Sequence, residues 1–129
     1  MSNGKAPSCG ADRPGGLEPA RVVDLAGLVQ YADRSVVSRT LAETTSVTIT
    51  LFAFDRGQKL SEHSTPFDAL VQVLDGEGEF TIAGTADRVA AGQAVLMPAH
   101  VPHAVNAVRP FKMLLTMYRG AAACGGCPK

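Results

Sequence analysis

The chain of 129 residues carries 12 basic and 12 acidic side chains, a formal net charge of zero at pH 7, and its length suits one domain. A neutral chain with five Phe, two Tyr and no Trp lacks the positive field and the stacking rings of nucleic-acid binding, so we expect no nucleic-acid partner. No apolar run approaches the roughly 20 residues of a membrane helix, and no apolar leader follows the N-terminus, so we expect a cytoplasmic protein with no membrane partner. The charged residues form no run, and we expect them, Arg39 and Lys112 included, on a solvated rim.

Both ends of the chain are rich in small residues and hold almost no large apolar side chain. We therefore expect flexible tails at residues 1–16 and 120–129 around a single domain at 17–119. The first stretch of that domain, Leu17 to Leu28, has enough apolar residues for a short helical turn or an irregular lead-in.

From Val36 onward the pattern is typical of short strands. The expected strands are 46–54, 69–74, 79–82, 88–89, 94–97, 103–108 and 111–118. The sequence Asp75-Gly-Glu-Gly78 between two of them predicts a hairpin. Strands about ten residues apart, with Gly or Pro at each corner, favour an all-β antiparallel sandwich or barrel.

Two stretches, residues 57–76 and 92–106, carry most of the residues suited to chemistry. The first contains a glycine, a histidine and a second glycine in a defined spacing: Gly57, His63 and Gly76. The second contains a glycine, a proline and a histidine: Gly92, Pro98 and His103. In this order and spacing they resemble the two motifs of the cupin superfamily, and the resemblance extends over about residues 36–118. It implies a double-stranded β-helix, which is a jelly-roll barrel, assembled as a homodimer.

The resemblance also implies a metal site with fewer ligands than the family uses. Metal-binding cupins place a second His and a Glu where this chain has Thr65 and Ala69, so His63 and His103 remain and a four-ligand site is excluded. Asp68 is one residue away from the Glu position and should face the opposite side of its strand. Two interpretations stay open: a weakly held divalent Fe, Mn, Ni, Cu or Zn ion, or two neutral imidazoles that are hydrogen-bonded without a metal.

Two further sets of residues could extend this site. His100 stands where the motif has Gly, so we expect a left-handed turn with an outward imidazole rather than a third ligand. Met97, Met113 and Met117 suggest a soft copper site, but residues 113, 115 and 117 alternate on one strand, and core packing is their expected role.

We expect the barrel mouth to bind a small polar molecule. The candidate pocket residues are Thr65, Phe67, Val71, Val73, Phe80, Met97 and Met113. One hypothesis is a metal-assisted oxygenase, isomerase or lyase in which the ion polarises a substrate oxygen, or a reaction in which a histidine acts as general base. The alternative is a non-enzymatic, metal-free module for ligand binding or interaction.

A C-x-x-C pair near the C-terminus, Cys124 and Cys127, offers a third hypothesis, thiol redox. Active pairs of this kind open a helix that lowers a thiol pKa, and no helix is expected in this tail. With Cys9 the chain has an odd number of cysteines, which suits reduced thiols better than a disulfide framework.

Overall fold

The computed structural model describes residues 16–119, and these form an all-β domain. One short 3₁₀ helix, η2 (Leu25–Leu28), comes first. The strands are β1 (Val36–Glu43), β2 (Val47–Phe54), β3 (Lys59–His63), β4 (Asp68–Ile82), β5 (Thr85–Ala90), β6 (Ala94–Met97), β7 (His103–Asn106) and β8 (Phe111–Tyr118). Within residues 16–119, no helix has the length and apolar character needed to cross a membrane.

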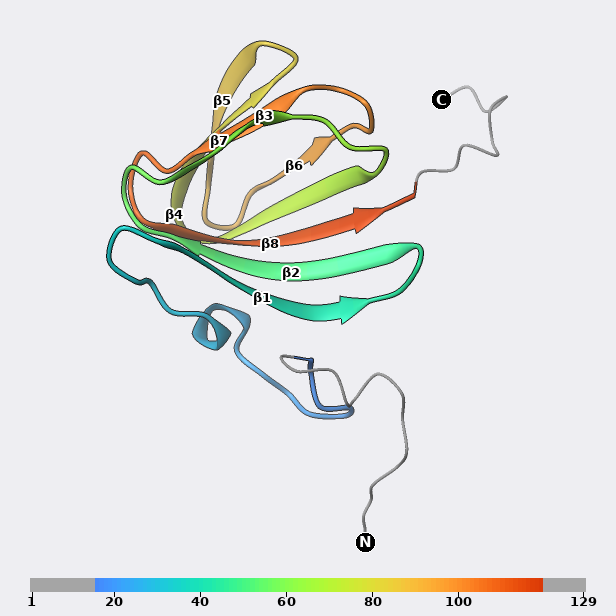
Figure 1. The fold of residues 1–129 in the computed structure, drawn as a ribbon. Helices are drawn as coiled ribbons and strands as arrows, with labels where there is room; N and C mark the ends of the chain where they lie inside the picture. The colour runs from blue at the N-terminus through green and yellow to red at the C-terminus, as the bar shows by residue number, and fades with distance from the viewer. Residues whose placement is uncertain (1–15, 120–129) are drawn as a thin grey trace, which may run out of the picture.

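All strand pairs are antiparallel, and the sheet curls into two facing layers. The strand order is β1-β2-β8-β4-β7-β3, with β5 and β6 also paired to β4. One layer contains β1, β2, β8, β6 and the first half of β4, and the other contains β3, β5, β7 and its second half. Figure 1 shows β1, β2 and β8 side by side below β3, β5 and β7. This confirms the expected double-stranded β-helix.

Strand β4 belongs to both layers because it bends in its middle, and the expected hairpin at 75–78 is wrong. Gly76 has a φ of +74°, and a Cβ there would lie 2.0 Å from the Pro110 carbonyl oxygen. A Cβ at Gly78 would lie 2.6 Å from the ring of Phe111. The two glycines let one continuous strand bend closely around Phe111 and cross between layers.

Three aromatic rings close the barrel at this bend. The rings of Phe54 and Phe111 stack with centroids 4.6 Å apart, and Phe80 meets Phe111 edge-on at 5.9 Å. All three side chains are fully buried, as are Val71 and Val73 in the adjoining core. We call this the closed end.

At the opposite end, which we call the open end, the two arms of β4 bring two rows of inward-facing residues together. Ala69 lies seven residues before Gly76 and Ile82 six after it, so both lie away from the closed end. Strand register places Ala69 in one row, which reads Glu43, Thr48, Met117, Ala69 and Met97. It places Ile82 in the other row, which reads His63, His103, Ile82 and Thr85.

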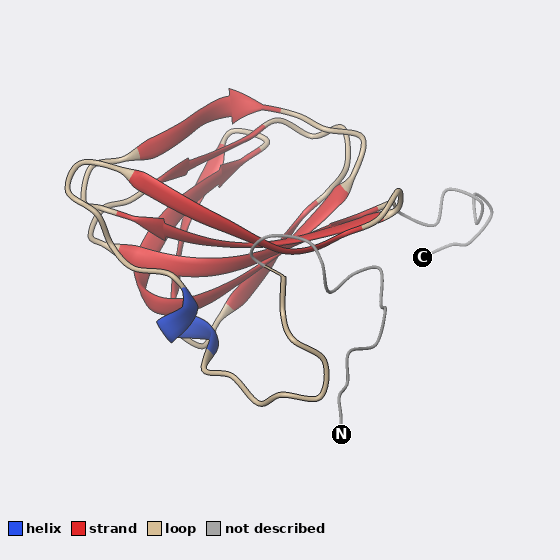
Figure 2. Cartoon of the chain, turned by 60° about the horizontal axis from the view of Figure 1, so that its bottom comes forward, coloured by secondary structure: helices blue, strands red, loops and turns tan. Residues whose placement is uncertain are grey.

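The lead-in packs on the outer face of the barrel, where Figure 2 shows the helix beneath the strands. Val29 is buried there with Leu41, Leu51 and Ala53, and Leu25 and Leu28 pack against them. The expected short helical turn is confirmed as η2. The expected tails lie outside the described residues, apart from Gly16.

Two charged residues under this lead-in correct the expected solvated rim. Lys112 is only 9% exposed, and its Nζ donates a hydrogen bond of 2.6 Å to the Ala26 carbonyl. The same ammonium lies 5.0 Å from the centroid of the Tyr31 ring. Arg39 is half-buried and donates to the Leu28 carbonyl at 3.3 Å. Both cations are drawn in because the lead-in presents backbone carbonyls to the outer face.

Candidate functional site

The open end brings together the two histidines that the motifs singled out. His63 ends β3 and His103 begins β7, and strand register pairs them directly. Their ring centroids are 4.5 Å apart, with the rings edge to face. His103 is 5% exposed, whereas His63 lies exposed at the rim. One imidazole is therefore embedded in the barrel wall and its partner faces solvent.

Both imidazoles are oriented by the backbone in the same way. Nδ1 of His63 lies 2.8 Å from the Ser61 carbonyl oxygen, and Nδ1 of His103 lies 3.2 Å from that of Val101. A carbonyl oxygen only accepts hydrogen bonds, so Nδ1 of each ring carries a proton, and in the neutral tautomer Nε2 is then the nitrogen with the lone pair. Metal-ligating histidines are commonly fixed by such a bond from the other ring nitrogen.

The surroundings of His103 favour its neutral form. Burial lowers the pKa of His103, and the nearby His63 lowers it further, while the Val101 carbonyl acts in the opposite direction. Because the pKa lies below the ordinary value of 6.5, His103 is neutral at pH 7. Its Nε2 is then available as a hydrogen-bond acceptor or metal ligand.

Thr65 and Asp68 are engaged in local turns rather than in the site. The Thr65 hydroxyl donates to the Phe67 carbonyl at 3.1 Å and accepts from the Phe67 amide at 3.2 Å. Asp68 accepts from the Ala99 amide at 2.8 Å, while Ala69 points into the barrel and is 1% exposed. The expected outward direction of Asp68 is thus confirmed.

His100 links the two loops at the open end through its backbone. It has a φ of +67°, which confirms the expected left-handed turn, and the residue is exposed. Its amide donates to the Thr65 carbonyl at 2.7 Å. The loops after β3 and after β6 are therefore joined beside the histidine pair.

Most of the expected pocket residues lie in the core below this pair. Side chains no more than 3% exposed include Val71, Val73, Phe80, Met97 and Met113. Phe67 is half-buried, with the Arg119 guanidinium 4.8 Å from its ring centroid. Their role in binding a ligand stays a prediction.

The structure also has a hollow of about 430 Å³ on the outer face. It lies under the lead-in, and its lining includes Leu17, Arg21, Asp24, Leu28 and Arg39. Its lining does not include His63 or His103, so it is separate from the candidate site.

Comparison with known proteins identifies the family. A family model described as "Cupin domain" matches residues 50–117, which is more than half of the chain and includes both histidines. This chain is a cupin. The match begins in β2 and ends in β8, so it covers seven of the eight strands wholly or in part.

Solved structures agree with this assignment. A conserved protein of unknown function, SPY1581 from Streptococcus pyogenes, is 42% identical, with 81% of this cupin and 91% of that chain covered and a TM-score of 0.77. A cupin superfamily protein from Desulfitobacterium hafniense is 31% identical, with 81% and 95% covered and a TM-score of 0.76. A cupin 2 conserved barrel domain protein from Leptotrichia buccalis is 39% identical, with 74% of this cupin covered and a TM-score of 0.73. The match covers 47% of the Leptotrichia chain. No curated protein matches.

The residues of this cupin do not fit a three- or four-ligand metal centre of the family type. Within residues 16–119 no group of three or more His, Cys, Asp or Glu side chains could hold an ion. Ala69 has no donor atom, and the Thr65 hydroxyl is bonded within its own turn. Two imidazole Nε2 atoms are what the motif positions offer.

Two features of the site were not predicted from the sequence. The carbonyls of Ser61 and Val101 orient the imidazoles, but any residue supplies a carbonyl, so no sequence signal marks them. The row in which Met97 and Met117 flank Ala69 depends on strand register, although the alternation around Met117 indicated its inward direction. The cysteines lie outside the described residues, so the redox hypothesis for Cys124 and Cys127 stays a prediction.

Proposed function

We propose that this cupin binds a small polar molecule at the open end of the barrel through Nε2 of His63 and His103. The observation that supports this is the pair of Nδ1–carbonyl hydrogen bonds, which leaves both Nε2 lone pairs for a ligand. Two neutral acceptors suit a ligand with hydroxyl or N–H groups. Apolar neighbours in the two rows, such as Ile82 and Met97, suit the remainder of such a molecule.

A weakly held divalent ion is compatible with the same two nitrogen atoms. Two protein ligands are fewer than the three that catalytic metal sites usually have, so water or ligand oxygens would complete the shell. Such an ion would supply Lewis-acid polarisation of a ligand oxygen, as oxygenase or isomerase chemistry requires. Without it, His103 still accepts a proton from a bound hydroxyl, or the protein acts as a non-enzymatic binding module.

The experiment follows the side-chain signals of the histidines by NMR in ¹⁵N-labelled full-length protein. Separate titrations with Zn²⁺, Ni²⁺, Mn²⁺, a set of hydroxy acids and a set of sugars cover the two classes of ligand. We expect at least one probe to shift or broaden His63 and His103 while leaving His100 unchanged. His100 is an internal control because it is an exposed histidine that is not part of the row containing His63 and His103.

Variants then separate the site from general surface binding. His63→Ala and His103→Ala should abolish the response to the active probe, and His100→Ala should retain it. If no probe affects His63 and His103, or if all three histidines respond alike, the proposal is wrong.

Homodimer assembly and a cytoplasmic location also remain predictions. Light scattering after size-exclusion chromatography would measure the mass in solution, and cell fractionation would measure the location.

A further inference from the structure

The rim of the open end carries an arginine that lies over a phenylalanine ring. The guanidinium of Arg119 is 4.8 Å from the ring centroid of Phe67. In the antiparallel register these two residues come one step beyond the Asp68–Tyr118 pair, which ends the ladder between β4 and β8. The Arg119 amide also donates to the Ser46 carbonyl at 3.2 Å, so the ladder between β8 and β2 extends to this position. The backbone of Arg119 is therefore fixed, and its charged group is placed by an aromatic ring.

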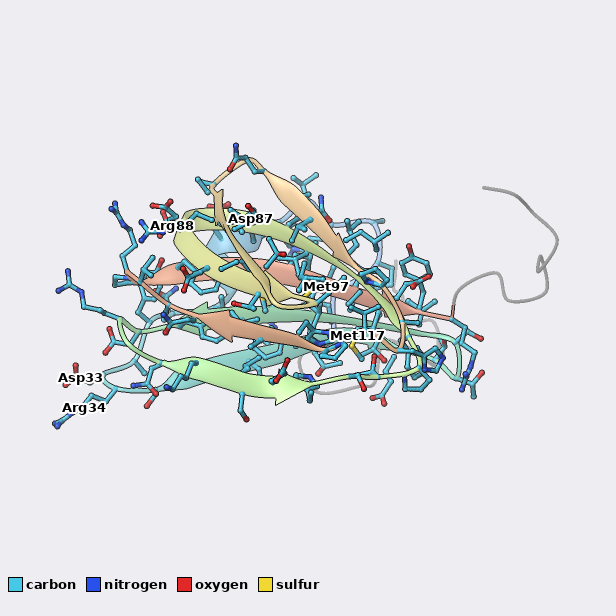
Figure 3. All side chains as sticks on the ribbon, turned by 90° about the horizontal axis from the view of Figure 1, so that it is seen from above. Asp33, Arg34, Asp87, Arg88, Met97 and Met117 are labelled. Carbon is cyan, nitrogen blue, oxygen red and sulfur yellow. The ribbon has the colours of Figure 1, made fainter. Side chains whose placement is uncertain are left out.

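The alternation of side chains along a strand directs this pair toward the inside of the barrel. Met117 packs against the inner core, and Arg119 follows it by two residues. Ala69 belongs to the same core, and Phe67 precedes it by two residues. Residues two apart on a strand share a face, so Arg119 and Phe67 lie on the inward side, roughly 7 Å closer to the rim than the Ala69–Met117 pair. Figure 3 shows Met117 within the body of the barrel, whereas the label of Asp33 marks its periphery.

The histidine pair lies on the facing layer at the same end of the barrel. Phe67 follows His63 by four residues, so their Cα atoms are at most about 14 Å apart. The loop between them is fixed, because the Thr65 carbonyl accepts the His100 amide and the Thr65 hydroxyl donates to the Phe67 carbonyl. Facing β-layers are roughly 10 Å apart. This separation suits a small molecule that contacts Arg119 at one end and an imidazole at the other.

The charge of Arg119 is not neutralised by a neighbouring side chain of the described part of the chain. Within residues 16–119, no carboxylate forms an ion pair with its guanidinium. The carboxylate of Asp68 is on the outer side of its strand and accepts the Ala99 amide at 2.8 Å. Glu43 lies at the same end on β1, and β2 separates that strand from β8. A guanidinium over a ring keeps its N–H groups for other acceptors, and their planar fork matches the two oxygens of a carboxylate.

We infer that the ligand of the open end is a small carboxylate whose charged group binds Arg119 over the ring of Phe67. A second polar group of the ligand, a hydroxyl or an N–H, donates to Nε2 of His63 or His103. This inference rests on the proposed function, because it names the class of ligand for the same pair of histidines. It makes Arg119 and Phe67 specificity residues, since the arginine selects the negative charge and the ring positions the guanidinium.

The test compares hydroxy acids with their amides, which have nearly the same shape and no charge. The probes are glycolate, lactate, mandelate and para-hydroxybenzoate, each beside the corresponding amide. Isothermal titration calorimetry on the full-length chain measures the affinities, and NMR of the same samples follows the histidine side chains. We expect at least one acid to bind at least tenfold more tightly than its amide, to shift the signals of His63 and His103, and to bind more weakly as the salt concentration rises.

Matched variants locate the carboxylate. Arg119 is exposed, so its variants should fold. Arg119→Gln should lower the affinity for the acid at least tenfold and leave the affinity for the amide unchanged, and Arg119→Lys, which keeps the charge without the planar fork, should recover part of the loss. Phe67→Leu should weaken acid binding by a smaller factor. Arg109→Gln is the control, because Arg109 is an exposed arginine that lies two residues before Phe111 at the closed end and pairs with Glu77 at 3.7 Å.

Three outcomes would overturn the inference. They are no binding of any acid, acids that bind no more tightly than their amides, and equal losses of affinity in Arg119→Gln and Arg109→Gln. The proposed function would survive each of these if an amide, a sugar or a metal ion still shifts the signals of His63 and His103. Acid binding that depends on Arg119 but moves neither histidine signal would instead contradict the proposed function and the placement of the ligand between the two layers.

Discussion

At the scale of single residues, the protonation state of His103 determines what the site can do. Its backbone anchor places the proton on Nδ1, and burial disfavours a second proton on Nε2. The neighbouring His63 acts in the same direction, since two imidazolium rings 4.5 Å apart would repel each other. His103 is therefore neutral near pH 7 and becomes cationic only on acidification.

This shift predicts a pH dependence of folding stability. The pKa of His103 in the folded state lies below the value of 6.5 expected in the unfolded chain, so the unfolded state takes up the proton first. The stabilising contribution is complete above pH 6.5 and is lost as the pH falls through the folded-state pKa. In urea unfolding experiments, we therefore expect the free energy of unfolding to fall between pH 7.5 and pH 5. We expect it to fall less steeply in the His103→Gln variant.

His100→Gln is the control for this experiment. Its imidazole is exposed, and we expect that variant to keep the slope of the parent protein. An unchanged slope in His103→Gln, or the same change in both variants, would contradict the account.

At the scale of elements, the bend of β4 allows one strand to belong to both layers of the barrel. A Cβ at Gly76 would meet the backbone of Pro110, and φ is positive there. At Gly92 φ is also positive, at +89°, but nothing lies within 4 Å of the added atom. Both glycines therefore have a left-handed backbone conformation, but only Gly76 is approached closely by another part of the backbone.

We predict that Gly76→Ala destabilises the protein much more than Gly92→Ala. The second change carries only the cost of a left-handed conformation, about 1–2 kcal/mol, whereas the first also forces backbone apart. Chemical denaturation of both variants measures the difference. Equal losses of stability would show that the bend does not depend on close approach at Gly76.

The same strand shows what a sequence can and cannot predict about this fold. Runs of apolar and β-branched residues correctly predicted strands near 46–54, 94–97 and 111–118, where the structure has β2, β6 and β8. The hairpin prediction at 75–78 failed because glycine-rich sequence marks either a turn or a close approach of another chain segment. Only the position of Phe111 distinguishes the two.

At the scale of the whole molecule, the barrel has one end filled by phenylalanine rings and another where the rings of His63 and His103 meet. The motif spacing predicted the cupin fold and both histidines. It could not predict ring orientation, because that depends on backbone carbonyls, or the Met97–Ala69–Met117 row, because that depends on register between distant strands. The prediction that Lys112 lies on a solvated rim was wrong for the same reason, because the carbonyl that accepts its hydrogen bond is 86 residues away along the chain.

The central claim is that backbone carbonyls hold Nδ1 of both imidazoles, so that Nε2 is the nitrogen offered to a ligand at the open end. A long-range ¹H–¹⁵N NMR spectrum of the histidine side chains near pH 7.5, without added ligand, tests it most directly. We predict that His63 and His103 both carry their proton on Nδ1 and show unprotonated Nε2 signals. Protons on Nε2 in these two rings would contradict the account, because no lone pair would then face a ligand.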